Sequence, residues 1–148
     1  MSKPTDVPVA TTRKIRDRCL CLSLQRAARR VGRQFDEALR PLGLTNGQFS
    51  LLASLNRPQP ARLGSVAAVL AMDRTTLTAA LKPLQRRGLV DVSIDQEDRR
   101  SRALTLTRQG RSLLAAAIPV WTRTHARLER QLADPEPDLL RRGLKALA

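Results

Sequence analysis

Residues 89–107 read LVDVSIDQEDRRSRALTLT, and this stretch decides the fold. Its two ends, LVDVSI and ALTLT, alternate apolar residues with polar or hydroxyl residues, which is typical of β-strands that bury one face. The segment between them, DQEDRRSR, contains six charged residues among its eight. The sequence therefore predicts a two-stranded hairpin whose tip, at residues 95–102, is strongly charged.

A helical pattern precedes this hairpin directly. Residues 62–71, RLGSVAAVLA, predict a short helix, and the tight turn AMD leads into a second helix at residues 73–88. Asp73 is placed to accept hydrogen bonds from the free N–H groups at the start of that helix, and Gly88 suits the left-handed position just past its end. Two short helices joined by a tight turn are a helix-turn-helix, and a hairpin after it makes a winged helix.

A long helical segment precedes the winged helix. Apolar residues recur every three or four positions from Leu20 to Leu42, so we expect a helix that begins near Arg13 and is ended by Pro41 and Gly43. At roughly 28 residues it would span about 40 Å. A single compact domain of 148 residues cannot bury such a helix, so we expect part of it to pack on a second subunit.

A second long helical segment follows the hairpin. Thr107 is placed to cap it, and its apolar face includes Trp121 and His125. The stretch DPEPD then interrupts the pattern, and Asp134 is expected to cap a last short helix at residues 136–147.

The expected fold is mainly α with a small β-wing: a winged helix-turn-helix flanked by long N- and C-terminal dimerisation helices, all in one structural domain. The expected divisions are a flexible arm (1–12), an N-terminal dimerisation helix (13–44), the winged helix-turn-helix DNA-binding region (45–106) and C-terminal dimerisation helices (107–148).

Charge and composition narrow the partners. The chain has 27 Lys and Arg against 13 Asp and Glu, a formal net charge of +14, which favours a polyanionic partner such as nucleic acid. No apolar run approaches the roughly 18 residues of a membrane span, and the N-terminus lacks a signal-peptide layout. We therefore expect a cytoplasmic protein without a membrane partner. Two cysteines and one histidine do not make a zinc-site pattern, so we expect no metal and no cofactor.

From Arg18 to Leu132 the chain resembles the MarR family of bacterial transcription regulators. Residues 42–55, LGLTNGQFSLLASL, are similar to the family's second helix, and residues 73–90 are similar to its recognition helix with the first wing strand. Residues 95–114, DQEDRRSRALTLTRQGRSLL, resemble its wing signature. The resemblance implies an obligate homodimer, a palindromic operator in double-stranded DNA, and repression that a small ligand or thiol oxidation relieves.

The resemblance also implies which residues contact DNA. The residues of the recognition helix implied to face the major groove are Arg74, Thr75, Thr76 and Thr78. Those implied to touch the DNA backbone are Lys82 and Arg86. In the wing, Arg100 matches the family's minor-groove arginine, Arg99 and Arg102 would reach phosphates, and Asp98 would orient the loop through a salt bridge. We expect Asp95, Glu97 and Asp98 to brace the arginines, and the alternative is a solvated charged turn.

The cysteines allow two interpretations. Residues 19–35, CLCLSLQRAARRVGRQF, resemble the first helix of the organic-hydroperoxide-sensing branch of the family, in which Cys21 takes the place of the reactive cysteine. That branch uses tyrosine hydroxyls to stabilise the thiolate, and this chain has no tyrosine. A redox sensor at Cys21, with Cys19 as a second candidate, therefore competes with a buried and inert cysteine.

Trp121 and His125 also allow two interpretations. They either pack in the core or a dimer interface, or line a pocket between the first and the later long helix. Such a pocket would admit a small aromatic or acyl ligand, with His125 or a nearby arginine at its polar end.

Two further function classes fit only part of the sequence. A thiol enzyme that uses Cys21 and His125 lacks a supporting glycine-rich loop, carboxylate pair or metal set, so we expect no enzyme. A basic architectural or nonspecific nucleic-acid-binding protein would use an arginine-rich helix face. Arg26, Arg29, Arg30 and Arg33 share one face of the first helix, which either attracts DNA or is simply a solvated face. That class does not explain the hairpin.

Overall fold

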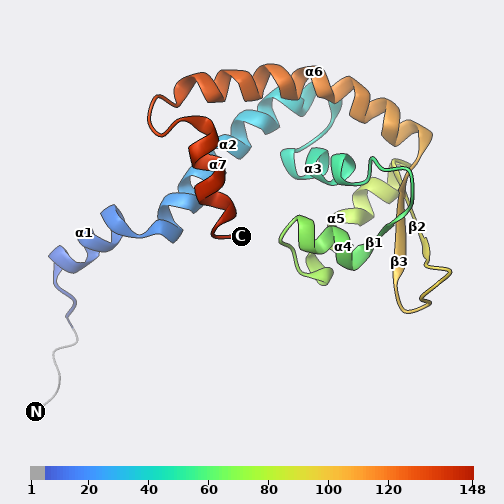
Figure 1. Ribbon diagram of the computed structural model, residues 1–148, viewed down its shortest axis with the longest axis horizontal. Helices are drawn as coiled ribbons and strands as arrows, with labels where there is room; N and C mark the ends of the chain where they lie inside the picture. The colour runs from blue at the N-terminus through green and yellow to red at the C-terminus, as the bar shows by residue number, and fades with distance from the viewer. Residues whose placement is uncertain (1–5) are drawn as a thin grey trace, which may run out of the picture.

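The computed structural model describes residues 6–148, and in it the chain is mainly helical with a small sheet, as expected. Its elements in chain order are α1 (Val9–Arg18), α2 (Leu20–Leu39), the 3-10 turn η1 (Arg40–Leu42), α3 (Asn46–Ser54), β1 (Ala61–Arg62), α4 (Leu63–Val69), α5 (Arg74–Arg86), β2 (Val90–Ile94), β3 (Arg102–Leu106), α6 (Arg108–Gln131) and α7 (Pro137–Lys145). Figure 1 shows α3, α4, α5 and the strands gathered at one end of the long helices α2 and α6, with α1 and α7 toward the other end.

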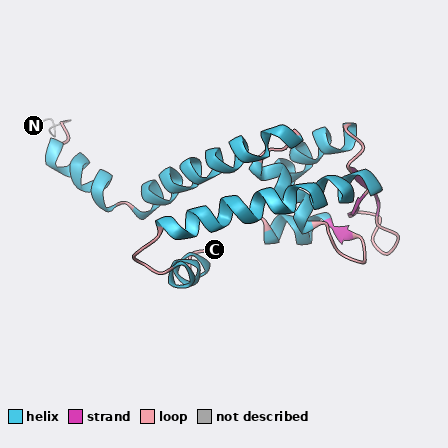
Figure 2. Cartoon of the chain, turned by 90° about the horizontal axis from the view of Figure 1, so that it is seen from above, coloured by secondary structure: helices cyan, strands magenta, loops and turns pink. Residues whose placement is uncertain are grey.

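The N-terminal helical segment is broken in two, so the expectation of a single helix from Arg13 was wrong. Cys19 is extended (φ −71°, ψ 111°), which ends α1 and starts α2. Its sulfur accepts a hydrogen bond from the backbone N–H of Leu22 at 3.5 Å, in the manner of a capping side chain. The helix α1 begins at Val9, within the range expected to be a flexible arm, and residues 1–5 of that arm lie outside the described residues. Figure 2 shows α1 extending away from the rest of the chain.

The junction between α2 and α3 is fixed by hydrogen bonds. Gly43 adopts the left-handed conformation (φ 67°) that ends the turn after α2. Thr45 and Gln48 form the reciprocal capping box that starts α3, with bonds of 3.2 and 3.1 Å. The Asp36 carboxylate of α2 also accepts from the backbone and side-chain amides of Asn46, at 2.7 and 2.8 Å. The start of α3 is therefore held against α2.

The expected hairpin is present, and a third short strand joins it. Strand β3 lies between β1 and β2, and both pairings are antiparallel. Leu104 pairs with Val92 on one side and with Ala61 on the other. Strand β1 was not predicted from sequence, because two residues are too few to show alternation.

The hydrophobic core lies where α3, α4, α5 and the sheet meet α6. Its fully buried side chains include Leu39, Leu52, Leu77, Leu81, Leu84 and Leu104. By contrast, α1 and α7 bury none of their residues. Thr107 caps α6 as expected, but Glu136 rather than Asp134 caps α7, because the helix begins at Pro137. Within residues 6–148, no helix combines the length and the apolar character needed to cross a bilayer.

Candidate nucleic-acid interface

The recognition helix α5 buries one face and exposes the other. Leu77, Leu81 and Leu84 are buried. The exposed residues Arg74, Thr75, Thr78, Lys82 and Arg86 follow helical spacing along a single face. Five of the six residues expected to contact DNA from this helix therefore share one exposed face.

Thr76, also expected at the major groove, is exposed, and its side chain takes part in the cap of α5. The Asp73 carboxylate accepts from the Thr76 backbone N–H at 2.7 Å and from its hydroxyl at 2.8 Å. These bonds, the backbone bond first, hold the pKa of Asp73 below its usual value. Because its hydroxyl already donates to Asp73, Thr76 stabilises the start of α5, whereas the Thr78 hydroxyl donates to the Arg74 carbonyl at 2.7 Å and keeps its oxygen exposed as an acceptor.

A glycine of α4 makes room for Arg74. A Cβ atom at Gly64 would lie 2.8 Å from Nη2 of Arg74, so the guanidinium lies directly over the first turn of α4. Arg74 therefore bridges the two helices of the helix-turn-helix at their exposed surface.

The wing tip is shaped by carboxylates. The buried Asp95 accepts from the backbone N–H groups of Glu97 and Asp98, at 2.8 and 3.3 Å. These bonds, with the Glu97 N–H as the largest cause, hold the pKa of Asp95 below its usual value. Asp98 accepts from the backbone N–H of Arg100 at 3.0 Å. The turn therefore holds Arg99 and Arg100 outward at the exposed tip.

Arg62 of β1 forms ion pairs with the wing loop, a role that was not predicted from sequence. Its Nε lies 3.0 Å from Asp95 Oδ2, and its Nη2 lies 2.7 Å from Glu97 Oε2. The expectation that Asp98 orients the loop through a salt bridge was wrong, because Asp95 and Glu97 carry the ion pairs. These carboxylates brace Arg62 rather than the wing arginines.

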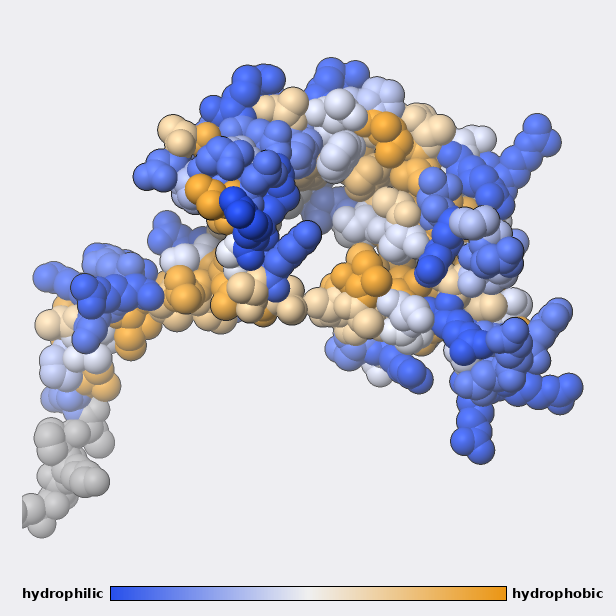
Figure 3. Space-filling view, viewed as in Figure 1, coloured by the Kyte–Doolittle hydropathy of each residue, from blue (hydrophilic) through white to orange (hydrophobic). Residues whose placement is uncertain are grey.

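The start of α5 and the wing tip lie on the same side of the chain in Figure 1. Figure 3 shows hydrophilic side chains projecting from the wing on that side. The exposed basic residues of α5 and the wing are Arg74, Lys82, Arg86, Arg99, Arg100 and Arg102. A helix and a wing that both present basic side chains match the electrostatic requirement of a DNA backbone.

Trp121 lines a small cavity between α2, α3 and α6. The cavity measures about 250 Å³, and its apolar wall includes Val31, Phe35 and Phe49. The Trp121 ring stacks on Phe49 at a centroid distance of 6.4 Å and on His125 at 4.8 Å. His125 does not line this cavity, and its Nε2 lies 3.8 Å from Glu129. Of the two expected pocket residues, Trp121 therefore lines the cavity, and His125 stacks on the Trp121 ring.

The cysteines lie at and just after the break between α1 and α2. Cys21 is exposed, and the Gln25 amide donates to its sulfur at 3.4 Å. Cys19 is half-buried. Cys21 is therefore accessible within this single chain, and accessibility is one requirement of a sensing thiol.

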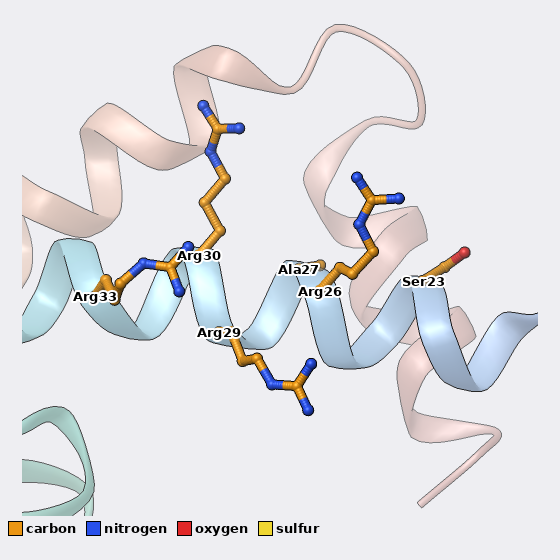
Figure 4. Close-up of a pocket in the computed structure, with 6 residues that line it drawn as sticks. All are labelled: Ser23, Arg26, Ala27, Arg29, Arg30 and Arg33. Atoms are coloured by element: carbon orange, nitrogen blue, oxygen red, sulfur yellow. The ribbon is translucent and has the colours of Figure 1, made fainter. Parts of the chain in front are cut away.

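Four arginines line an open groove along α2. Arg26 and Arg30 extend toward α6 and α7, whereas Arg29 extends to the other side of the helix (Figure 4). The fourth arginine is Arg33. In the part of the chain from residue 6 onward, none of the four forms an ion pair. They contribute positive charge far from the wing.

A helix-turn-helix followed by a basic wing defines the chain as a winged-helix protein. Residues 44–101 match the model of the MarR family. The solved structure of the M. tuberculosis transcriptional regulator MosR in complex with DNA is 38% identical, with a TM-score of 0.79, and the match covers 87% of this chain and 92% of that one. The chain belongs to the MarR family, whose members are transcription regulators rather than enzymes.

Two curated relatives show how much of the chain is shared. The transcriptional activatory protein BadR of Rhodopseudomonas palustris is 35% identical over 95 residues, which are 62% of this chain and 54% of BadR. The organic hydroperoxide resistance transcriptional regulator of Bacillus subtilis is 29% identical over 101 residues, which are 68% of this chain and 69% of that protein. The chain therefore spans only about half the length of BadR.

Proposed function

We propose that the protein is a homodimeric, sequence-specific DNA-binding transcriptional regulator that represses its target genes and is released by a small ligand or by thiol oxidation. The observation that carries this proposal is that the start of α5 and the wing tip lie on the same side of the chain (Figure 1), where they can enter adjacent major and minor grooves. The DNA complex of the similar regulator MosR supports it. A protein that binds chromosomal operators works in the bacterial cytoplasm.

The dimer is supported by apolar surface that this chain leaves uncovered. Ile15 of α1 is 55% exposed, Leu20 of α2 is 69% exposed and Leu139 of α7 is 52% exposed. Figure 3 shows apolar side chains along α1 and α2. Because a second copy carries the same unpaired helices, a two-fold symmetric pair buries both sets at once.

The release step is supported by two separate features. The cavity beside Trp121 suits a small aromatic or short acyl compound, and it touches both α2 and α3, so a ligand there contacts a dimerisation helix and the helix-turn-helix region together. The exposed Cys21 supports an oxidant as the other input. The similarity to the B. subtilis organic hydroperoxide resistance regulator favours this second input.

The test is selection of binding sites from a random duplex library with the purified, reduced protein. We expect an enriched inverted repeat whose half-sites lie about one helical turn, or about 10 base pairs, apart. If binding shows no motif and collapses as salt is raised, the protein is a basic architectural or nonspecific nucleic-acid-binding protein instead. A promoter–reporter fusion carrying the selected site then gives the sign of regulation, which BadR, as an activatory protein, shows can differ among relatives.

A further inference from the structure

We propose that Arg62 is a positioning residue that sets the angle of the wing relative to the helix-turn-helix, so that the wing and α5 engage one DNA site together. This inference rests on the proposed DNA-binding function and names a determinant of it. Arg62 belongs to β1 and lies outside both α5 and the β2–β3 hairpin.

The backbone of Arg62 is fixed at the point where the sheet meets the helix-turn-helix. Arg62 pairs with Ala103 of β3 and is also the residue that immediately precedes α4. Its position is therefore set by the sheet on one side and by the helix-turn-helix on the other.

The side chain of Arg62 reaches two carboxylates of the wing loop. It contacts Asp95 at 3.0 Å through Nε and Glu97 at 2.7 Å through Nη2. The planar guanidinium thus fixes a direction as well as a distance. Asp95 in turn holds the backbone of Glu97 and Asp98, so one continuous set of contacts runs from the start of α4 to the turn that carries Arg99 and Arg100.

This link stands alone in the described chain. Within residues 6–148, Arg62 is the only side chain from outside residues 95–102 that forms a hydrogen bond or ion pair with that loop. The Arg62 side chain is 48% exposed and that of Glu97 is 83% exposed, so this ion pair adds little to folding stability. The Asp95 side chain is only 11% exposed, so the pair between Arg62 and Asp95 is the firmer of the two contacts that orient the loop.

Glu97→Gln separates wing orientation from simple electrostatic attraction, because the two predict opposite changes in DNA affinity. Glu97→Gln removes a negative charge close to the DNA surface, so attraction to phosphates alone predicts tighter binding. Loss of wing orientation predicts weaker binding from the same change. Arg62→Ala tests the other partner, and Arg62→Lys keeps the charge without the planar fork. Arg57→Ala removes an exposed arginine, five positions earlier in sequence, that forms no ion pair in the described chain.

The experiment measures the affinity of each variant for the selected operator and for a shortened duplex that ends before the minor groove reached by the wing. We expect Arg62→Ala to weaken binding to the full operator about tenfold and to the short duplex by less than about twofold, the scale of losing one wing contact. Glu97→Gln should weaken full-operator binding by a few-fold, Arg62→Lys should lie between Arg62→Ala and the wild type, and Arg57→Ala should affect both duplexes equally.

Tighter binding by Glu97→Gln, or an equal loss on both duplexes for Arg62→Ala, overturns the inference, because Arg62 would then be a phosphate contact or a general stabilising residue. Thermal unfolding of each variant separates the second of these cases. If the wild-type protein does not distinguish the operator from random duplex, the proposed function itself fails and the inference fails with it.

Discussion

The guanidinium of Arg87 donates a hydrogen bond of 2.7 Å to the carbonyl oxygen of Gly43. Arg87 is the residue that ends α5, and Gly43 ends the turn between α2 and α3. A single side chain therefore joins the end of α5 to the junction between α2 and α3. The cavity beside Trp121 is lined by residues on both sides of that junction, including Phe35 and Phe49.

Arg87→Ala should lower the free energy of unfolding by about 0.5–1.5 kcal/mol, because the bond is charge-assisted but exposed to water. Urea denaturation at a fixed protein concentration measures the change, since the stability of the proposed dimer would depend on concentration. Arg108→Ala, which removes an exposed arginine at the start of α6, is the matched control and should change stability by less than about 0.5 kcal/mol. Equal effects of the two variants would show that the Arg87 bond contributes nothing specific.

Gly110→Ala should destabilise the fold severely. A Cβ atom at Gly110 would lie 2.1 Å from the carbonyl oxygen of Leu89, a backbone atom that cannot move without disturbing the start of the wing. We expect a loss of about 3 kcal/mol or more, measured by thermal or urea unfolding. Gly143→Ala in α7 is the control, because a Cβ there meets no atom within 4 Å, and helix propensity predicts a gain of about 0.5–1 kcal/mol. A mild effect at Gly110 would contradict the close approach of α6 to Leu89.

Asp36 should contribute a pH-dependent part of stability. The hydrogen bonds from Asn46, with the backbone bond as the largest cause, hold the pKa of Asp36 below its usual value. Since the folded pKa lies below the unfolded pKa of about 3.9, the contribution is present above that pH and is lost as pH falls through the folded pKa.

The variant Asp36→Ala should therefore cost about 1–2 kcal/mol at pH 7, on the scale of a lost helix-capping interaction, and less at pH 3. Urea unfolding of the wild type and the variant at both pH values gives the two differences. Glu37→Ala changes the adjacent exposed carboxylate and should show no such trend. A difference for Asp36→Ala that stays constant between pH 7 and pH 3 would rule out this role.

Much of the DNA-binding part was predictable because its signals are local. A helix cap bonds to backbone groups two or three residues away, and the caps predicted at Asp73 and Thr107 were confirmed. The hairpin, predicted from the alternation around Leu104, was also confirmed. The wing ion pairs were not predictable in the same way. Arg62 and Glu97 are 35 positions apart in sequence, and only the pairing of β1 with β3 brings them together.

The break at Cys19 shows another limit. The apolar spacing continues across this residue, so periodicity predicts one helix, whereas the extended backbone of Cys19 separates two. The hydrogen bond between the Thr76 hydroxyl and the Asp73 carboxylate was also not predicted from sequence, and a DNA contact of Thr76 stays a prediction.

Arg100→Ala should separate specific from nonspecific binding. Because Arg100 is exposed at the wing tip, its loss should weaken binding to the selected operator by about 1–3 kcal/mol and binding to random duplex only slightly. Fluorescence anisotropy with both duplexes at one salt concentration measures the two effects. Arg127→Ala, on the far part of α6, removes the same charge and should leave the ratio of the two affinities unchanged. Equal losses on both duplexes for Arg100→Ala would mean that Arg100 acts only as a general phosphate contact.

Cys21→Ser should abolish any response to organic hydroperoxide. In the wild type, the Cys21 thiolate would attack the peroxide, so that an S–O bond forms as the O–O bond breaks and an alcohol leaves, giving a sulfenic acid. That polar group would lie at the start of α2, next to apolar surface that we assign to the dimer, so operator affinity should fall about tenfold or more and return with added thiol.

The measurement is operator binding before and after peroxide treatment, and again after reduction, for the wild type, Cys21→Ser and Cys19→Ser. Cys19→Ser is the matched control, because Cys19 is half-buried and its sulfur already accepts from Leu22. Loss of response in Cys21→Ser alone makes Cys21 the sensing thiol. An unresponsive wild type removes the redox input and leaves the cavity beside Trp121 as the input site, since that cavity contacts both α2 and α3 without any cysteine.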